Sequence, residues 1–564
     1  MTYKEMMYRY WLFVVAFIVG LVMVAPQLVF IAKAGHSYQG IYMFGSDAET
    51  HYLARMQEFL DTRSVGNPFL YEYGGSSLSP LFTFGEGLLT LPSFVIPISV
   101  PTLNLIYKFI LSAIIFLLIY KLAYELTKHK FWSLVTAIAI LFGHGLFSFS
   151  GIHGLLTWQN ISSQFALYAR PINPELSSII FFAYLLAMWR SFVSPRLKYI
   201  IIQALLLAAS FYVYFYLWTF LILVYILTIL FWFWKKNLRY GVHMLISLVG
   251  AILLAIPALI NLFQFYRLGQ AGPVLGLLGL NTFFSWNISS FGVLAVLVLV
   301  SVLYKQKNAN VRDYFLIILI FAAFISINQQ LVTHIQIQEG HYHWYYNEPI
   351  FIIILLYYLF QWQKSFKWVV LAPIVLLIAS IINVVSIQNS SYAFWEPTAI
   401  NQQTSAPILK WLKEHTPNQS VVLADNNIST LVPIYTANKV YWNPYAVYYS
   451  LPVDTIEYRL FVYLKLNKYK SPLNDEVMKK DLIVMGQQNL DIETFIDNDI
   501  LSIYPAGLAF RYSYFLNHFI GERNKFRLDY IVTNDNQNPA WDLSGFKWSL
   551  VFSNNGYNIL KINP

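Results

Sequence analysis

Long apolar segments divide this sequence, and each is close to the length that a helix needs to cross the hydrocarbon core of a membrane. A helix rises about 1.5 Å per residue, so about 20 apolar residues span about 30 Å of hydrocarbon. We expect about eleven spanning helices, at residues 11–31, 103–126, 131–151, 176–193, 199–214, 215–234, 241–263, 288–304, 313–331, 348–363 and 367–387. The sequence therefore predicts an all-α polytopic membrane bundle.

The composition supports the same class of protein. Hydrophobic residues make up 57% of the chain and charged residues 12%, with a mean hydropathy of +0.52, which is too apolar for a soluble fold. The net charge of +9 would suit nucleic acid in a soluble protein, but here most Lys and Arg lie in short runs between apolar segments, where they set orientation. Nucleic-acid partners are therefore excluded, and the absence of cysteine excludes disulfides and thiolate chemistry.

The segment at residues 81–98 decides the topology. It contains Glu86, Pro92 and Pro97, which make a poor straight helix, and we expect it to be interfacial or re-entrant. The basic clusters between spans then share the side of Lys4 and Arg9, as the positive-inside rule requires. This arrangement predicts a multi-pass plasma-membrane protein with a cytoplasmic amino terminus and with everything after about residue 390 outside the cytoplasm.

The chain changes character after about residue 395, where polar and apolar residues become mixed. We predict one helix and several short strands, at residues 405–415, 421–424, 439–442, 529–532, 548–552 and 557–562. The fold class is accordingly a transmembrane domain at residues 1–390, including a first outer loop at residues 32–102 with interfacial helices, followed by an extracytoplasmic α/β domain at residues 391–564.

The first outer loop contains the densest group of ionisable residues. Asp47, His51 and Arg55 recur at i, i+4 and i+8, so they share one face of a predicted helix, and the opposite face is apolar. Such a helix can lie in the headgroup plane and present a carboxylate, an imidazole and a guanidinium to a substrate. Ser46 to Glu49 also fits a capping box, so Glu49 is open to a purely structural interpretation.

Two further loops are expected on the same outer side. Arg170 is almost the only cation of the loop at residues 152–175, and its guanidinium suits either bidentate phosphate binding or anchoring at the membrane interface. His341 and His343 would point the same way in an extended segment, where they could bind a metal; hydrogen bonding to a sugar or phosphate is the favoured alternative.

This pattern resembles the type-C glycosyltransferases, integral membrane enzymes that use lipid-linked sugar donors. The resemblance lies in Gly45-Ser46-Asp47-Ala48-Glu49-Thr50-His51-Tyr52 after the first span and in the order of span, acidic outer loop, many spans and soluble outer domain. It implies that Asp47 is the catalytic carboxylate and Glu49 a second acid, and that the two share a divalent metal, Mg or Mn. The motif here is Asp-x-Glu instead of the Asp-x-Asp of some members, and no acceptor motif of oligosaccharyltransferases occurs in the tail.

The chemistry of such a transfer agrees with these residues. Moving a sugar from a polyprenyl phosphate to a hydroxyl needs a base for the acceptor proton and a cation for the departing phosphate. We expect Asp47 and Arg170 in these roles, with His51, Arg55, His341 and His343 binding substrate. The expected partners are a lipid-linked sugar donor, membrane lipid, and a glycan, lipid or protein acceptor. A polysaccharide ligase or polymerase of another fold, a transporter, and a receptor or scaffold remain alternatives.

Overall fold

The computed structural model of the 564-residue chain divides into two compact units. The bundle unit comprises Met1–Val29, Asn104–Ile260 and Asn281–Phe394, and the sheet unit comprises Phe30–Leu103, Asn261–Leu280 and Trp395–Pro564. The structure describes residues 3–45, 49–63, 66–74, 84–157, 164–267, 286–306, 309–335, 338–363, 371–443, 445–446, 449, 451–468, 508–535 and 541–563. The first outer loop thus groups with the carboxyl-terminal part of the chain, whereas we had assigned it to the transmembrane domain.

Long helices build the bundle unit, which contains all or part of each. They are α1 (Tyr3–Ala34), α4 (Val100–Thr127), α5 (Lys130–Phe142), α6 (Phe149–Thr157), α7 (Ser177–Val193), α8 (Leu197–Phe211), α9 (Phe215–Trp234), α10 (Leu238–Leu254), α11 (Ile256–Arg267), α13 (Ser290–Gln306), α14 (Val311–Ile327), α17 (Glu348–Gln363) and α18 (Leu371–Gln403). Short helical turns join some of them, namely η4 (Pro171–Leu176), α15 (Gln330–Thr333), α16 (Glu339–Tyr342) and η5 (His343–Asn347).

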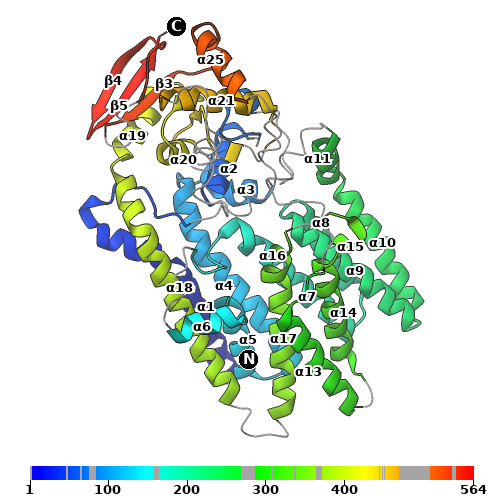
Figure 1. Ribbon diagram of the computed structural model, residues 1–564. Coiled ribbons are helices and arrows are strands. Elements are labelled where there is room, and N and C mark those ends of the chain that lie inside the picture. The colour runs from blue at the N-terminus through cyan, green and yellow to red at the C-terminus, as the bar shows by residue number, and fades with distance from the viewer. Residues whose placement is uncertain are drawn as a thin grey trace. The chain divides into compact units, whose positions relative to one another are not determined.

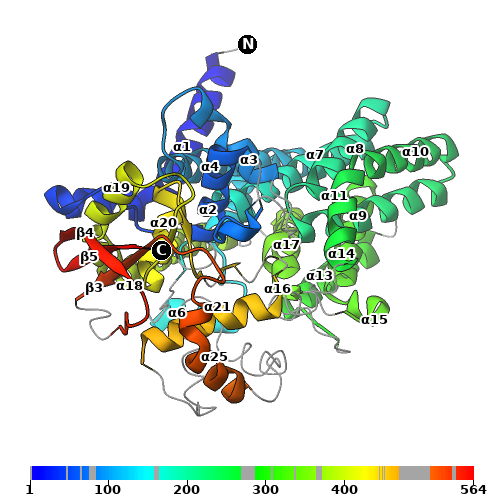
Figure 2. The ribbon, with the colours of Figure 1, turned by 90° about the horizontal axis from the view of Figure 1, so that it is seen from above.

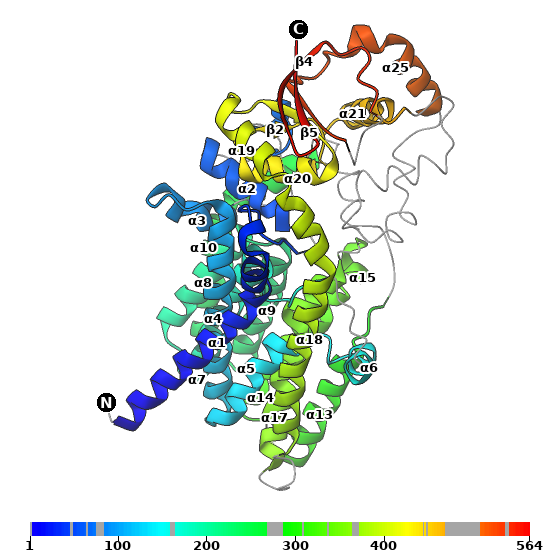
Figure 3. The same ribbon diagram turned by 90° about the vertical axis from the view of Figure 1, so that its left-hand side faces the viewer.

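The helices of the bundle unit pack in neighbouring pairs. Helix α8 contacts α7 and α10, and α10 also contacts α9 (Figure 2). Helix α17 contacts α5, α13 and α14, and the last two run alongside it (Figure 3). Side chains with no exposed surface fill these contacts, and they include Phe181, Phe220, Leu319 and Ile354. Burial of such side chains in contact with other helices fixes the positions of the loops at the helix ends.

Each predicted span overlaps at least one helix, but fewer helices are long enough to cross a membrane. Within the described residues, five helices are long and apolar enough to cross a membrane, or six if the bent pair α10 and α11 counts as one span. That pair bends by 58° at its junction, where we had predicted one continuous span at 241–263. The polytopic helical class is therefore confirmed, whereas the count of eleven is not.

The predicted span at residues 131–151 is wrong in its second half. Helix α5 ends at Phe142, and Gly143 caps it by donating its N–H to the carbonyl of Ala139. Gly145 then adopts a φ of +86°, a conformation that residues with a Cβ rarely take. The chain turns here and starts the separate helix α6, so the residues of this turn lie at the end of the helix and not inside it.

One carboxylate joins the ends of two helices in the bundle unit. Glu125 near the end of α4 forms ion pairs with Lys121, Lys128 and Arg190, the last of which lies near the end of α7. The first two basic clusters between predicted spans are therefore at the same end of the bundle. This shared end is what the predicted topology requires of them, although it does not identify the side of the membrane.

A mixed five-stranded sheet forms the framework of the sheet unit. Its strands are β1 (Val421–Leu423), β2 (Lys439–Val440), β3 (Tyr530–Asn534), β4 (Trp548–Asn554) and β5 (Tyr557–Ile562), in the order β2-β1-β3-β5-β4. Strand β1 runs parallel to β2 and β3. Strand β5 runs antiparallel to β3 and β4, and these three strands lie side by side in Figure 1. All of the predicted strands are thus confirmed, and residues 405–415 are helical as expected.

Helices cover both faces of this sheet. Ile531 and Leu560 pack into a core with aromatic side chains of α21 (Val453–Leu466) and α25 (Leu508–Glu522). On the opposite face, Trp411 of α19 (Ala406–His415) lies against the rings of Tyr530 and Phe552. Successive side chains of a strand, such as Tyr530 and Ile531, point to opposite faces of the sheet and thus pack against different helices.

The first outer loop contributes short helices to the same unit. They are η1 (Gly35–Ser37), α2 (Glu49–Thr62), η2 (Tyr71–Tyr73), α3 (Phe84–Thr90) and η3 (Leu91–Phe94), and α2 packs against α3 and α20 (Asn426–Tyr435). The segment at 84–94 is thus too short to be a spanning helix, in agreement with our interpretation of residues 81–98. Beyond these helices, the main-chain N–H of Val440 in β2 donates to the carbonyl of Phe69, 2.8 Å away, so first-loop backbone extends the edge of the sheet.

Candidate functional site

The predicted catalytic residue Asp47 lies outside the described residues, as do Ser46 and Ala48. Glu49 is the first residue of α2 and is buried. Its Oε2 accepts a hydrogen bond from the N–H of Gly45, 2.7 Å away. The carboxylate of Glu49 thus accepts from the main chain of Gly45, whereas the capping box predicts a hydrogen bond with the main chain of Ser46.

His51 is enclosed in aromatic side chains. It is 1% exposed, and its ring stacks nearly parallel to the ring of Tyr445, with centroids 5.4 Å apart. Its Nε2 lies 3.1 Å from the hydroxyl of Tyr449. Burial lowers the pKa of His51 well below its usual value, and the nearby charge of Arg55 lowers it further. The imidazole is therefore neutral at neutral pH.

Arg55 lies on the same buried face of α2 and has no exposed surface. Its Nε is 2.7 Å from Oε1 of Glu86 in α3, which is also buried. The expectation that this face of α2 presents its polar groups to a substrate at the membrane surface is wrong for His51 and Arg55. The physical reason is that Glu86 and Tyr449, which are remote in sequence, interact with these groups and offset the cost of removing them from water.

In the bundle unit, two of the predicted outer loops meet at Arg170. This residue immediately precedes η4 and is half-buried. Its Nη2 donates to the hydroxyl of Tyr345 in η5, 2.8 Å away. The loop at residues 152–175 and the loop at residues 332–347 therefore meet here, and the contact fixes the direction of the guanidinium.

Aromatic rings surround His341 in this same place. The ring centroid of Tyr216 is 4.5 Å away and that of Tyr345 is 5.5 Å away, and the Tyr214 hydroxyl is hydrogen bonded to Nδ1 of His341. The Tyr216 hydroxyl also donates to Oε1 of Gln338, at 2.8 Å. Arg170 and His341 therefore share Tyr345 as a neighbour, and together they form what we call the Arg170–His341 cluster.

The sequence-based interpretation missed the tyrosines of this cluster, because we took Tyr214, Tyr216 and Tyr345 for residues of the membrane interface or the core. Their position in the sequence could have indicated this role, because Tyr214 and Tyr216 lie at the start of the predicted span at residues 215–234. It also missed Lys108 in α4, which is 1% exposed and has its Nζ 5.9 Å from the ring of Phe165. A charged lysine within a predicted span is costly, which makes Lys108 a candidate functional residue.

His343 does not share the surroundings of His341. Residues 339–347 form α16 and η5, so the extended segment that would align the two imidazoles is absent from this described stretch. Burial lowers the pKa of His343; the charge of Glu348 counteracts this shift, and that of His144 adds to it. Among the described residues, no group of three His, Asp or Glu side chains could hold a metal ion. The proposed metal ligands Asp47 and Glu49 stay a prediction, because one of them lies outside that set.

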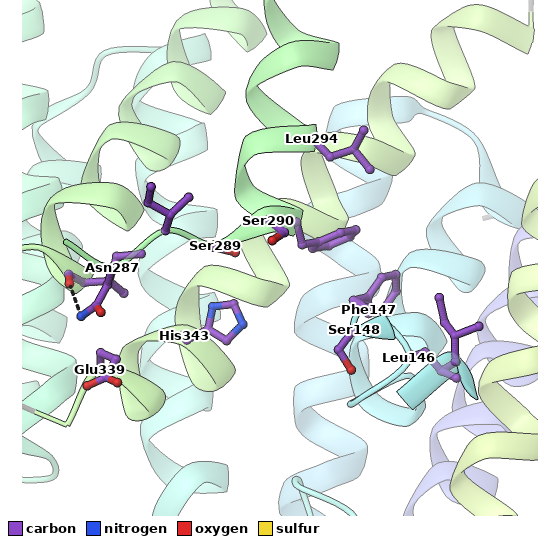
Figure 4. Close-up of a pocket in the computed structure, with 13 residues that line it drawn as sticks. Leu146, Phe147, Ser148, Asn287, Ser289, Ser290, Leu294, Glu339 and His343 are labelled. Carbon is purple, nitrogen blue, oxygen red and sulfur yellow. Dashed lines mark hydrogen bonds between the residues drawn. The ribbon is translucent and has the colours of Figure 1, made fainter. Parts of the chain in front are cut away.

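His343 instead faces a cavity of about 750 Å³ in the bundle unit. Its walls come from the turn after α5, the start of α13, the end of α14, and α16 with η5. Figure 4 shows His343 and Glu339 on one side and Phe147 and Ser148 on the other. Most of the remaining lining is apolar and includes Leu146, Ile152, Ile288, Phe291, Leu294 and Ile327. The cavity thus combines an apolar wall with a small group of polar side chains.

The turn that forms one wall of this cavity is held in place from both sides. Asn383 in α18 donates its Nδ2 to the carbonyls of Phe142 and His144, at 2.8 and 3.0 Å. Nδ1 of His144 lies 3.7 Å from Oε2 of Glu348 in the first turn of α17. The shape of the cavity therefore depends on contacts among α5, α17 and α18.

The predicted site residues consequently fall into two described groups. Arg170, His341 and His343 belong to the bundle unit, and the first two of them lie in one cluster. Glu49, His51 and Arg55 belong to the sheet unit.

No family model matches the chain, and no curated protein sequence matches it. Among solved structures, the chain is similar to the oligosaccharyltransferase AglB from Archaeoglobus fulgidus in complex with an inhibitory peptide and a dolichol-phosphate, at 12% identity and a TM-score of 0.47, covering 94% of this chain and 70% of that one. It is also similar to ArnT from Cupriavidus metallidurans bound to undecaprenyl phosphate, at 10% identity and a TM-score of 0.49, covering 98% of each chain. At such low identity the likeness does not extend to substrates, which must be inferred from the chain's own residues.

Proposed function

We propose that this chain is a membrane glycosyltransferase that moves a sugar from a polyprenyl-phosphate-linked donor to an acceptor on the outer face of the membrane. The observation that carries the proposal is the Arg170–His341 cluster, in which a half-buried guanidinium is oriented by Tyr345 where two polar loops meet. The predicted topology, with a cytoplasmic amino terminus, is part of the proposal.

A guanidinium in this position suits a phosphate group. It presents a planar fork of N–H donors that matches two phosphate oxygens, and it keeps its charge at any physiological pH. Partial removal from water strengthens its attraction for an anion. Arg170 would therefore bind the phosphate of the donor and stabilise the negative charge that grows on it as the sugar leaves. His341, held between Tyr214 and Tyr216, would hydrogen bond to the sugar or the phosphate.

In the proposed reaction the acceptor hydroxyl attacks the anomeric carbon of the sugar. The bond between that carbon and the phosphate oxygen breaks, and its electron pair leaves with the polyprenyl phosphate. The carboxylate of Asp47 takes the hydroxyl proton as general base. Asp47 and Glu49 carry oxygen ligands that suit Mg or Mn, and a cation bound by them would supply positive charge that stabilises developing negative charge.

The cavity beside His343 offers a place for an apolar chain. Its lining is largely aliphatic and aromatic, and its volume of about 750 Å³ is within the range of small-molecule sites. We propose that the part of the lipid carrier next to the phosphate enters it. Such binding would leave only the polar head of the donor in contact with water.

The decisive experiment measures transfer in proteoliposomes that contain undecaprenyl-phosphate-linked sugars, for wild type, Asp47→Asn and a control. Asp454→Asn is the control, because that side chain is 71% exposed and pairs only loosely with Lys525, at 3.9 Å. We expect consumption of the lipid-linked sugar by wild type and by the control, and none by Asp47→Asn, with equal membrane insertion of all three. Absence of consumption by wild type would favour the transporter or scaffold alternatives. Full activity of Asp47→Asn would remove Asp47 from the mechanism.

A further inference from the structure

The chain that leads into the acidic motif is held by a side chain from the carboxyl-terminal part of the sheet unit. Gln403 is the last residue of α18 and is 5% exposed. Its Oε1 accepts from the N–H of Gln39 at 2.9 Å, and its Nε2 donates to the carbonyl of Ile41 at 2.7 Å. One amide thus satisfies main-chain groups of two alternate residues, in the manner of a neighbouring strand.

A second contact follows directly along the same segment. The hydroxyl of Tyr435, at the end of α20, accepts from the N–H of Tyr42 at 3.1 Å. The ring of Tyr435 also lies against that of Phe44, with centroids 6.4 Å apart. Burial raises the pKa of Tyr435, and the charge of Glu49 acts in the same direction, so the hydroxyl stays protonated beside the motif.

Beyond the motif, α2 is anchored to the same part of the chain. Lys439 in β2 forms an ion pair with Glu58 in α2, and the two side chains are 2% and 7% exposed. Burial lowers the pKa of Lys439 and raises that of Glu58, while their mutual attraction opposes both shifts. The Tyr449 hydroxyl lies 3.1 Å from Nε2 of His51 in the first turn of α2. Residues 403–449 therefore hold the chain both before and after the motif.

Between these anchors, the motif is closed by the hydrogen bond from the N–H of Gly45 to Glu49. A group that acts as a general base must be held within a fraction of an ångström of its productive position, because small displacements reduce the rate steeply. Such precision requires that the main chain on either side of the group is held in place.

We propose that the carboxyl-terminal α/β domain, residues 395–564, holds the chain at residues 39–45 and 49–58, on either side of the acidic residues, for the transfer reaction, and that Gln403 and Tyr435 are positioning residues. This inference rests on the proposed function. The inference assigns a role to a domain in whose sequence we recognise no catalytic motif. Neither side chain needs to touch the substrate, because both act through the main chain at residues 39–42.

The test compares Gln403→Ala with Asn401→Ala in the full-length protein. Asn401 lies in the last turns of the same helix and its side chain is exposed, so its replacement controls for changes in α18. Hydrogen exchange of the peptide at residues 39–49 gives a first readout that does not depend on activity. We expect exchange about 10-fold faster in Gln403→Ala, because two hydrogen bonds to the main chain are lost, and unchanged exchange in Asn401→Ala.

Transfer kinetics give the second readout. For Gln403→Ala we expect kcat to fall by about 10²-fold while KM for an undecaprenyl-phosphate-linked sugar stays within about 2-fold, since donor binding is assigned to the bundle unit. Tyr435→Phe keeps the ring and removes only the hydroxyl, so it should change both readouts in the same direction and by less. Its fold is not expected to suffer.

The outcomes separate this inference from the proposed function. Unchanged exchange in Gln403→Ala overturns the inference, whatever the activity. Faster exchange with unchanged kcat overturns it as well, because the support would then serve no chemistry. If wild type transfers no sugar, the proposed function fails, and the positioning of the motif for that transfer fails with it, although the exchange data would still show whether the support exists.

Discussion

Arg55 and Glu86 form an ion pair in the interior of the sheet unit, with 2.7 Å between Nε and Oε1 and side chains that are 0% and 3% exposed. The two residues belong to α2 and α3, which pack against each other within the first outer loop. A fully buried pair of this kind fixes α2 against α3.

Removing one partner of this pair should destabilise the protein strongly. Arg55→Met leaves the carboxylate of Glu86 buried without its cation, at a cost of roughly 3–5 kcal/mol. The double variant Arg55→Met with Glu86→Leu removes both charges and should recover most of the loss. Thermal unfolding followed by tryptophan fluorescence measures the difference. A single variant as stable as the double one would show that the pair contributes little.

Replacing Arg170 by lysine should reduce transfer and leave folding intact. Lysine keeps the charge but loses the planar fork and the geometry of the contact with Tyr345. We expect kcat/KM for the lipid-linked sugar to fall by at least about 10-fold, in line with the loss of one oriented donor at a developing anion. Arg196→Lys is the matched control, because that side chain is exposed between α7 and α8. Equal losses in both variants would argue against a phosphate role for Arg170.

The stability of the protein should depend on His343 in acid. Its pKa is lowered in the folded state by burial, so the unfolded chain takes up a proton first as the pH falls. The stabilisation is complete above the ordinary histidine pKa of about 6.5 and is lost as the pH falls from there through the lower folded value. His343→Gln should remove this part of the pH dependence. The comparison requires unfolding midpoints of both proteins between about pH 7 and pH 5, and parallel curves would contradict the prediction.

Filling the cavity should weaken binding of the lipid carrier. Leu294 lines the cavity from α13, and tryptophan at this position would occupy part of its volume of about 750 Å³. We expect the KM for the lipid-linked donor to rise several-fold, with a smaller change in kcat. Leu297→Trp provides the control, since Leu297 is on the same helix, is 61% exposed and does not line the cavity. An unchanged KM in Leu294→Trp would place the lipid elsewhere.

The sequence predicted the secondary structure of this chain well, for physical reasons that differ between the two units. Apolar runs of spanning length mark the helices of the bundle, and short apolar runs mark strands such as β3, which is buried at most of its positions. The prediction failed where a local feature was overlooked. Gly143 and Gly145 end α5 early, and the turn that they form carries one wall of the cavity.

The candidate site was predictable only in part. Arg170 stood out as almost the only cation in its loop, and the predicted topology placed that loop on the same side as residues 332–347. The burial of Arg55 could not be foreseen, because its partner Glu86 becomes a neighbour only in the folded chain. The same holds for His51 and Tyr449, which are far apart in sequence. Helical periodicity predicts which residues share a face of a helix, but it does not predict which other residues pack against that face.

The hydrogen bond between Val440 and Phe69 also bears on any attempt to isolate the carboxyl-terminal domain. Cut away from the first loop, the domain would keep its core but expose unpaired main-chain groups along β2. Open strand edges recruit strands from other molecules, so an excised domain at residues 395–564 should self-associate. Co-expressing a peptide that carries residues 66–74 should keep it monomeric.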